Sequence, residues 1–130
     1  DRRLLPIVER HLDQILDGSK ADDGWLREVR AMVARTVCDG HPSLPTVARR
    51  LGQSERTLQR RLGERGLVWK QLVEDVRREL ALRYLEDEKT PLTEVAFLLG
   101  YSELSAFHRA FRRWTGTTPI AHRRRAVEKA

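Results

Sequence analysis

The sequence predicts an all-α protein with about seven helices plus an N-terminal helix, in which two helix-turn-helix subdomains are joined by a long linker helix. Three observations support this prediction. Apolar residues recur at three- and four-residue steps in successive segments, which is the period of an α-helix. A pattern of helix, glycine turn and helix occurs twice. The stretch Val68–Asp87, between the two copies, contains neither glycine nor proline.

The composition restricts the class of protein. Of the 130 residues, 40% are hydrophobic and 34% are charged, which is typical of a helix-rich folded domain. No window reaches the ~18 apolar residues of a membrane span, so we expect no membrane partner. The single cysteine, Cys38, cannot form an internal disulfide, which favours a reducing cytoplasm. One cysteine and four widely spaced histidines do not form a zinc-ligand set, so we expect neither a metal nor a cofactor.

Residues 1–24 are expected to form a helix followed by a linker. The helix Asp1–Leu16 is predicted from apolar residues at helical steps, namely Leu5, Val8, Leu12 and Ile15. Because the chain opens on a helix without an initiator methionine, we interpret this segment as the remnant of a missing upstream domain. A dimerisation surface and a helix folded onto this same domain are the alternatives.

Residues 25–67 are predicted to form the first helix-turn-helix subdomain. It should comprise three helices, Trp25–Cys38, Leu44–Leu51 and Glu55–Glu64. Ser43 and Ser54 precede the second and third of these and are suited to accept a hydrogen bond from the first helical turn. The third helix is the first candidate recognition helix.

Residues 68–89 are predicted to be the linker helix. About 20 residues of α-helix span ~30 Å, which is close to the ~34 Å turn of B-DNA. Such a helix would place two recognition helices in successive major grooves.

Residues 90–130 are predicted to form the second helix-turn-helix subdomain. Thr90 and Pro91 are suited to the N-cap and first helical positions of its first helix. Gly100 is suited to the turn, because a left-handed backbone disfavours a β-carbon. A last helix should begin at Thr118-Pro119 and end at Arg123–Arg125, where positive charge favours both the helix dipole and phosphates.

The two copies are in register. Ala48 corresponds to Ala96 with an offset of 48 residues, and beyond the turn Leu58 corresponds to Phe107 with an offset of 49. One helix-turn-helix pattern alone is a weak signal, because many helical bundles contain similar spacing. Two copies, each with basic residues on its second helix, are a much stronger one.

The positive charge is concentrated on these two copies. Thr46–Gly66 has six arginines and two glutamates, and Glu103–Arg125 has six arginines and one glutamate. The intervening Val68–Lys89 has five basic and six acidic residues. Arginine binds guanine and phosphate with two parallel hydrogen bonds, so this distribution favours nucleic acid over ordinary solvated helix faces.

The aromatic residues around the second motif are predicted by their spacing to lie in the core instead of forming a stacking surface for single strands. They are Tyr84, Phe97, Tyr101, Phe107, Phe111 and Trp114.

The segment Leu80–Arg125 resembles the C-terminal signature of the AraC/XylS family of bacterial transcription regulators. The resemblance is carried by Val-Ala-Phe-Leu-Leu-Gly-Tyr, then Ala-Phe-His-Arg-Ala-Phe-Arg-Arg-Trp-Thr-Gly, then Pro119. Val47–Gly66 is similar to the first helix-turn-helix of that family. The resemblance implies a seven-helix domain that binds double-stranded DNA in the cytoplasm, at the bacterial nucleoid. It also implies an effector-binding or dimerisation domain upstream.

The resemblance also implies which residues contact DNA. The base-contacting candidates are Arg56, Gln59, Arg60, Leu104, Ser105, His108 and Arg109. The phosphate-contacting candidates are Arg61, Arg112, Arg113, Arg123 and Arg124. Gln59 can pair with adenine, and an arginine can pair with guanine. Leu104 is apolar where a polar base-contacting residue is expected, but it could contact a thymine methyl group. Glu55 is expected to interact with its own helix dipole more than with a cytosine.

Two other classes of function are weighed against DNA binding. A helical protein-interaction module, in which one or both motifs are structural, should expose apolar residues where this sequence places arginines. An enzyme is not expected, because no nucleophile–base pair, phosphate-binding loop or carboxylate cluster has useful spacing. For a regulator, RNA polymerase is a possible further partner.

Overall fold

The computed structural model describes residues 24–40 and 42–129, so the predicted helix Asp1–Leu16 lies outside the described part of the chain. Within that part there are seven α-helices and no strand, which confirms the predicted all-α class. The helices are α2 (Gly24–Val37), α3 (Leu44–Arg50), α4 (Glu55–Glu64), α5 (Trp69–Leu85), α6 (Leu92–Leu98), α7 (Leu104–Thr115) and α8 (Pro119–Lys129).

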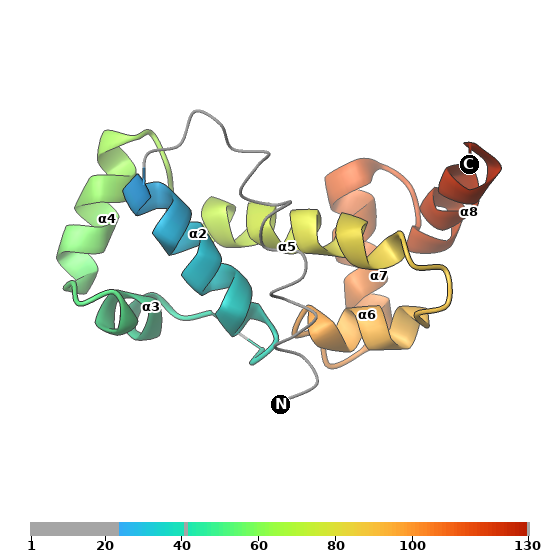
Figure 1. The fold of residues 1–130 in the computed structure, drawn as a ribbon, viewed down its shortest axis with the longest axis horizontal. Coiled ribbons are helices and arrows are strands. Elements are labelled where there is room, and N and C mark those ends of the chain that lie inside the picture. The colour runs from blue at the N-terminus through green and yellow to red at the C-terminus, as the bar shows by residue number, and fades with distance from the viewer. Residues whose placement is uncertain (1–23, 41, 130) are drawn as a thin grey trace.

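Helix α5 is the central element. It packs against α2 on one side and against α6 on the other, while α4 and α8 lie at opposite ends of the molecule (Figure 1). Buried apolar residues of α2 to α7 form one continuous core. The fully buried side chains include Val29 of α2, Leu58 and Leu62 of α4, and Phe107 and Phe111 of α7. The second helix of each helix-turn-helix, α4 or α7, is therefore held in place by its own apolar face.

The linker helix is shorter than predicted. Helix α5 has 17 residues instead of about 20, which corresponds to about 25 Å. It ends before Asp87 because the chain turns there: the Asp87 carboxylate accepts from the Lys89 N–H at 3.0 Å and its carbonyl accepts from the Thr90 N–H at 3.1 Å. Helix α4 lies beyond the N-terminal end of α5 (Figure 1), so the length of α5 alone does not set the separation of α4 and α7.

The internal repeat is present in the backbone itself. Helices α3 and α6 both have seven residues, and both are followed by a glycine with positive φ, 70° at Gly52 and 87° at Gly100. The next residue then bonds back in the same way: the Gln53 N–H donates to Ala48 O at 2.9 Å, and the Tyr101 N–H donates to Ala96 O at 3.0 Å. This is the hydrogen bonding of a left-handed helix C-cap.

The two copies differ in how their helices begin. The Ser43 and Ser54 hydroxyls accept from the N–H groups of Thr46 and Thr57, at 3.2 and 3.1 Å, as predicted. In the second copy Pro91, not Thr90, is the N-cap of α6, and Glu103 is the N-cap of α7. Neither forms a side-chain cap hydrogen bond.

This difference gives a testable expectation for stability. Ser54→Ala removes the hydrogen bond at the start of α4 and should lower the free energy of unfolding by about 1 kcal/mol. Glu103→Ala, at the equivalent cap of α7, should lower it by less, because no cap bond is lost there. Urea unfolding followed by circular dichroism measures both. Equal losses in the two variants would contradict the assignment of Ser54 as a cap.

Two sequence-based expectations about side chains are wrong. Phe97 was predicted in the core but is 57% exposed, because the buried face of this helical turn is formed by Val95, Ala96, Leu98 and Leu99. Helix α8 does not end at Arg123–Arg125 but continues to Lys129. These arginines therefore lie within the helix, and the predicted interaction with its C-terminal dipole does not apply. The other predicted aromatic residues are buried or half-buried.

Candidate nucleic-acid interface

Helix α4 presents one polar face to solvent. Arg56, Gln59 and Arg60 are all exposed and lie three and four residues apart, so they share one side of the helix. Within the described residues, none of these three side chains has a hydrogen-bond or ion-pair partner. Leu58 and Leu62, on the other side, are fully buried and hold the helix against the core. Glu55, also exposed, lies in the first turn, where its charge favours the helix dipole.

Arg61 is placed differently from its neighbours. Its guanidinium lies 4.9 Å from the centre of the Trp25 ring, and that of Arg65 lies 4.4 Å from it. With the Gln53 amide oriented to satisfy the network, its oxygen accepts from Trp25 Nε1 at 2.7 Å and from Arg61 Nη1 at 3.0 Å. Trp25 therefore anchors the inner side of α4 by cation–π contacts. The sequence pattern did not indicate this cluster, because Trp25 is 36 positions from Arg61.

Among the base-contacting candidates, helix α7 presents fewer exposed side chains than α4. Ser105 and Arg109 are exposed, whereas Leu104 is half-buried and packs against the core. The half-buried His108 ring lies edge-on to Phe107 with the ring centres 6.3 Å apart. His108 Nε2 is buried without a hydrogen-bond partner among the described residues. Of the four base-contacting candidates on this helix, Ser105 and Arg109 are the two that are exposed, and the Ser105 hydroxyl donates a hydrogen bond to Glu103 Oε2 at 3.4 Å.

The remaining phosphate-contacting candidates fall into two groups. Arg112 and Arg124 are exposed, and the described residues give neither of them a partner. Arg113 of α7 forms an ion pair with Glu74 of α5 at 2.8 Å, and Arg123 Nε of α8 donates to Leu85 O, the last carbonyl of α5, at 3.2 Å. Arg113 and Arg123 therefore connect the second motif to α5 as well as adding positive charge.

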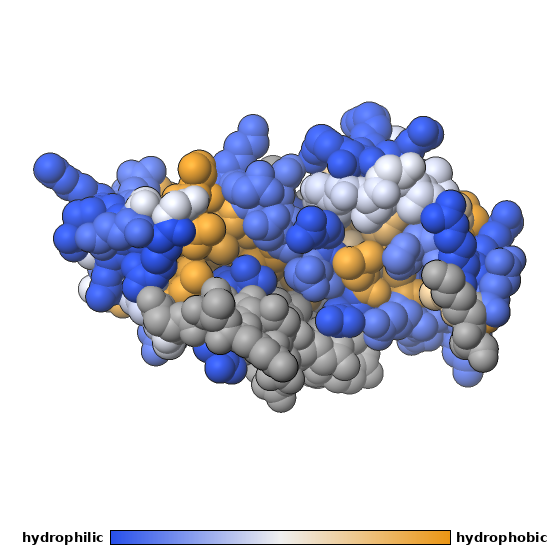
Figure 2. Space-filling model, turned by 90° about the horizontal axis from the view of Figure 1, so that it is seen from above, coloured by the Kyte–Doolittle hydropathy of each residue, from blue (hydrophilic) through white to orange (hydrophobic). Residues whose placement is uncertain are grey.

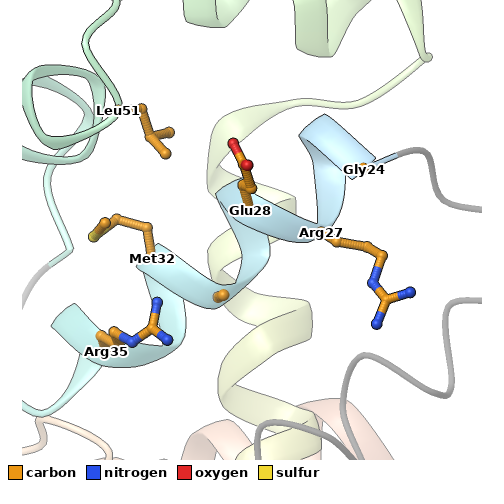
Figure 3. A pocket seen from close by; sticks show the side chains of 7 residues that line it. Gly24, Arg27, Glu28, Met32, Arg35 and Leu51 are labelled. Atoms are coloured by element: carbon orange, nitrogen blue, oxygen red, sulfur yellow. The ribbon is translucent and has the colours of Figure 1, made fainter.

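Described residues line two hollows of note, one of which borders the phosphate-contacting candidates. One, of about 550 Å³, lies between α2 and the end of α3, where Met32 and Leu51 face each other and Arg27 points away (Figure 3). The other, of about 400 Å³, is lined by Leu92, Ile120 and Val127, together with Arg124. Only Arg123 and Arg124 are shared between these hollows and the DNA-contacting candidates.

Charged and polar side chains occupy much of one face of the described surface, with apolar areas between them. Figure 2 shows hydrophilic residues over most of one face, including the end that α4 forms. No group of three or more histidine, cysteine or acidic side chains within the described residues is arranged to hold a metal ion. None of the described helices is both long and apolar enough to cross a membrane.

Comparison with known proteins decides what these two motifs are. A family model described as a helix-turn-helix domain matches residues 47–125, which include both motifs and the helix between them. The chain belongs to the AraC-type helix-turn-helix family. The resemblance stated from its motifs is thereby confirmed.

The relatives of this AraC-type domain are transcription regulators. It is 39% identical over 117 residues to the ornithine utilization regulator of Pseudomonas aeruginosa, a match that covers 90% of this chain and 34% of that protein. It is 43% identical over 102 residues to the HTH-type transcriptional regulator VirS of Mycobacterium tuberculosis, covering 78% of this chain and 30% of that protein. The chain thus spans about a third of the length of these relatives.

Solved structures show the same fold. The transcriptional regulator CdpR from Pseudomonas aeruginosa is 40% identical with a TM-score of 0.62, covering 74% of this chain and 31% of that one. The C-terminal domain of AraT, a response regulator from Geobacillus stearothermophilus, is 27% identical with a TM-score of 0.67, covering 78% and 85% of the two chains. The chain is therefore a DNA-binding domain of the AraC type, its partner is double-stranded DNA, and its family, which includes transcription regulators, is not one of enzymes.

Proposed function

We propose that α4 and α7 both contact bases, in successive major grooves of one DNA duplex. The observation that carries this proposal is the equivalence of Arg60 and Arg109. They occupy the same position in the two copies, 49 residues apart, both are exposed, and neither has a partner within the described residues. A guanidinium that is fixed on a helix and free of internal bonds is suited to the O6 and N7 atoms of guanine.

The other candidate residues are assigned by their exposure and by their position relative to Arg60 and Arg109. Arg56 and Gln59 contact bases beside Arg60, and Ser105 contacts a base beside Arg109. Leu104 and His108 are half-buried, so we assign them to the edge of the α7 contact, with Leu104 against a thymine methyl group. By this assignment α4 contacts bases through three exposed polar side chains, and α7 through two, with Leu104 and His108 at the edge of its contact.

Positive charge around the two helices supplies affinity without sequence information. Arg112 and Arg124 are assigned to phosphates because they are exposed and unpaired among the described residues. Arg61, Arg113 and Arg123 have internal partners, so we expect them to approach phosphates only with their remaining donors. Such contacts fix the register of a protein on DNA and make its affinity fall with salt.

The whole regulator requires more than this domain. The relatives are about three times as long as the matched segment, and we propose that an effector binds the portion that this domain does not include. We further propose that the regulator acts at the nucleoid in the bacterial cytoplasm and that RNA polymerase is a second partner. The alternative of a protein-interaction module is not favoured for α4 and α7, because the large exposed apolar residues of the described chain are Val68, Phe97, Ile120 and Val127.

Selection from a pool of randomised duplexes tests the proposal. The bound DNA should be enriched in an asymmetric site with two short blocks whose centres lie about 10 bp apart. Dimethyl sulfate methylation of guanine N7, which lies in the major groove, should prevent binding in both blocks. One enriched block, with interference confined to it, would show that only one helix contacts bases and would overturn the proposal.

A further inference from the structure

The turn of the second helix-turn-helix packs directly against the first half of the domain. A β-carbon on Gly100 would lie 2.5 Å from Val37 O, 2.7 Å from Gly40 O and 2.9 Å from Gly40 Cα. These are backbone atoms of the last residue of α2 and of the turn that follows it. At Gly52, the equivalent position of the first turn, a β-carbon would meet nothing within 4 Å. The two turns share one backbone conformation, but only at Gly100 does backbone from another segment approach the turn glycine this closely.

Arg77 of α5 connects the two sides of this contact. Its Nη2 donates to Gly40 O at 2.6 Å, and its guanidinium lies 5.5 Å from the centre of the Tyr101 ring. The Tyr101 ring in turn lies 6.0 Å from that of Phe107, which belongs to α7. Burial raises the pKa of Tyr101 above its usual value, so the ring beside Arg77 is a neutral phenol at physiological pH. A continuous set of contacts therefore runs from the end of α2 to the second recognition helix.

A second connection lies one turn earlier on α5. Glu74, three residues before Arg77, forms the 2.8 Å ion pair with Arg113 of α7. Helix α2 itself packs along α5. Consequently α5 holds the end of α2 and the outer side of α7 through neighbouring positions of one rigid helix.

We propose that this junction, formed by Val37, Gly40, Arg77, Gly100 and Tyr101, fixes the placement of α7 relative to α4 and makes the domain selective for the spacing between the two blocks of its DNA site. The inference rests on the proposed function, in which both helices contact bases. It adds that residues far from the DNA determine which spacing is accepted, and it makes Arg77 a positioning residue instead of a DNA-contacting one.

The physical reason is the geometry of the duplex. One added base pair moves the second block by about 3.4 Å along the axis and rotates it by about 35°. Helices joined by a rigid junction cannot follow this movement without losing contacts at one block. Helices joined by a loose connection follow it at little cost, but they lose affinity for the best spacing because the second contact is no longer pre-organised.

The experiment measures the dissociation constant on duplexes whose spacer is lengthened or shortened by one and two base pairs, for four proteins at one salt concentration. Wild type should lose about tenfold in affinity or more for each single change. Arg77→Ala should lose about tenfold on the best spacer but vary by no more than about threefold among spacers. Arg78→Ala is the matched control. The Arg78 side chain is 42% exposed and forms an ion pair with Glu79, so this substitution removes the same charge outside the junction.

Arg77→Lys is the fourth protein. It keeps the charge but loses the planar guanidinium over Tyr101, so its preference for the best spacer should lie between those of wild type and Arg77→Ala. It also decides the question if Arg77→Ala does not fold. An Arg77 variant that folds and keeps the spacing profile of Arg78→Ala would overturn the junction proposal, and so would a wild type that needs both blocks but tolerates every spacer. A wild type whose affinity is unchanged when either block is scrambled would instead overturn the two-helix function on which the junction proposal depends.

Discussion

Gly100→Ala should lower the free energy of unfolding by about 3 kcal/mol or more. Two costs add at this position. The backbone has φ of 87°, a left-handed conformation that costs an alanine about 1–2 kcal/mol. The new β-carbon would also meet three backbone atoms at 2.5–2.9 Å, and backbone cannot move aside as the end of a flexible side chain can.

Gly52→Ala is the matched control for this prediction. Its φ of 70° imposes the same kind of backbone cost, but the space around its β-carbon is open. It should therefore cost only about 1–2 kcal/mol. Urea unfolding followed by circular dichroism compares the two. If the two variants lose the same stability, the contact between the second turn and the end of α2 does not contribute to the folded state.

The sequence was sufficient to predict the repeated architecture. The two copies have the same apolar spacing and a glycine at the same place, so the helices α3 and α6 and the turns after them follow from local rules. The caps at Ser43 and Ser54 also follow from local rules, because a cap involves only residues within one helical turn. The family resemblance of the second motif pointed to the same fold.

The sequence could not predict the contacts between distant segments. Nothing in the residue types around Gly100 indicates that a β-carbon at this position would meet Val37 O and Gly40 O, since backbone atoms are the same for every residue. The exposure of Phe97 was missed for a different reason. The spacing of Val95, Ala96 and Leu99 indicates the buried face of α6, and Phe97 lies off that face despite its aromatic side chain.

The candidate interface was predicted to the extent that helical spacing determines exposure. Arg56, Gln59, Arg60 and Arg109 are on outward faces, as their spacing from buried Leu58 and Phe107 requires. Spacing cannot indicate which exposed arginines are already engaged. The partners of Arg61 and Arg113, namely Trp25 and Glu74, are more than 30 residues away in the sequence.

In the proposed complex, Arg60 and Arg109 contact different blocks of one DNA site. Arg60→Ala and Arg109→Ala should each weaken binding to the best duplex by about tenfold to 100-fold, because each removes a two-pronged base contact worth about 1–3 kcal/mol. Each variant should remain as stable as wild type, because neither side chain has an internal partner among the described residues. Arg78→Ala, which removes the same charge elsewhere, should weaken binding by far less.

The decisive measurement pairs these variants with duplexes in which one block is scrambled. Here the first block is the one that α4 contacts and the second is the one that α7 contacts. If each arginine contacts its own block, Arg60→Ala weakens binding no further once the first block is scrambled, but it keeps its full effect when the second block is scrambled. Arg109→Ala should behave in the opposite way. If both substitutions instead weaken binding equally on every duplex, the two arginines serve only as general positive charge. Base recognition by both helices would then be wrong.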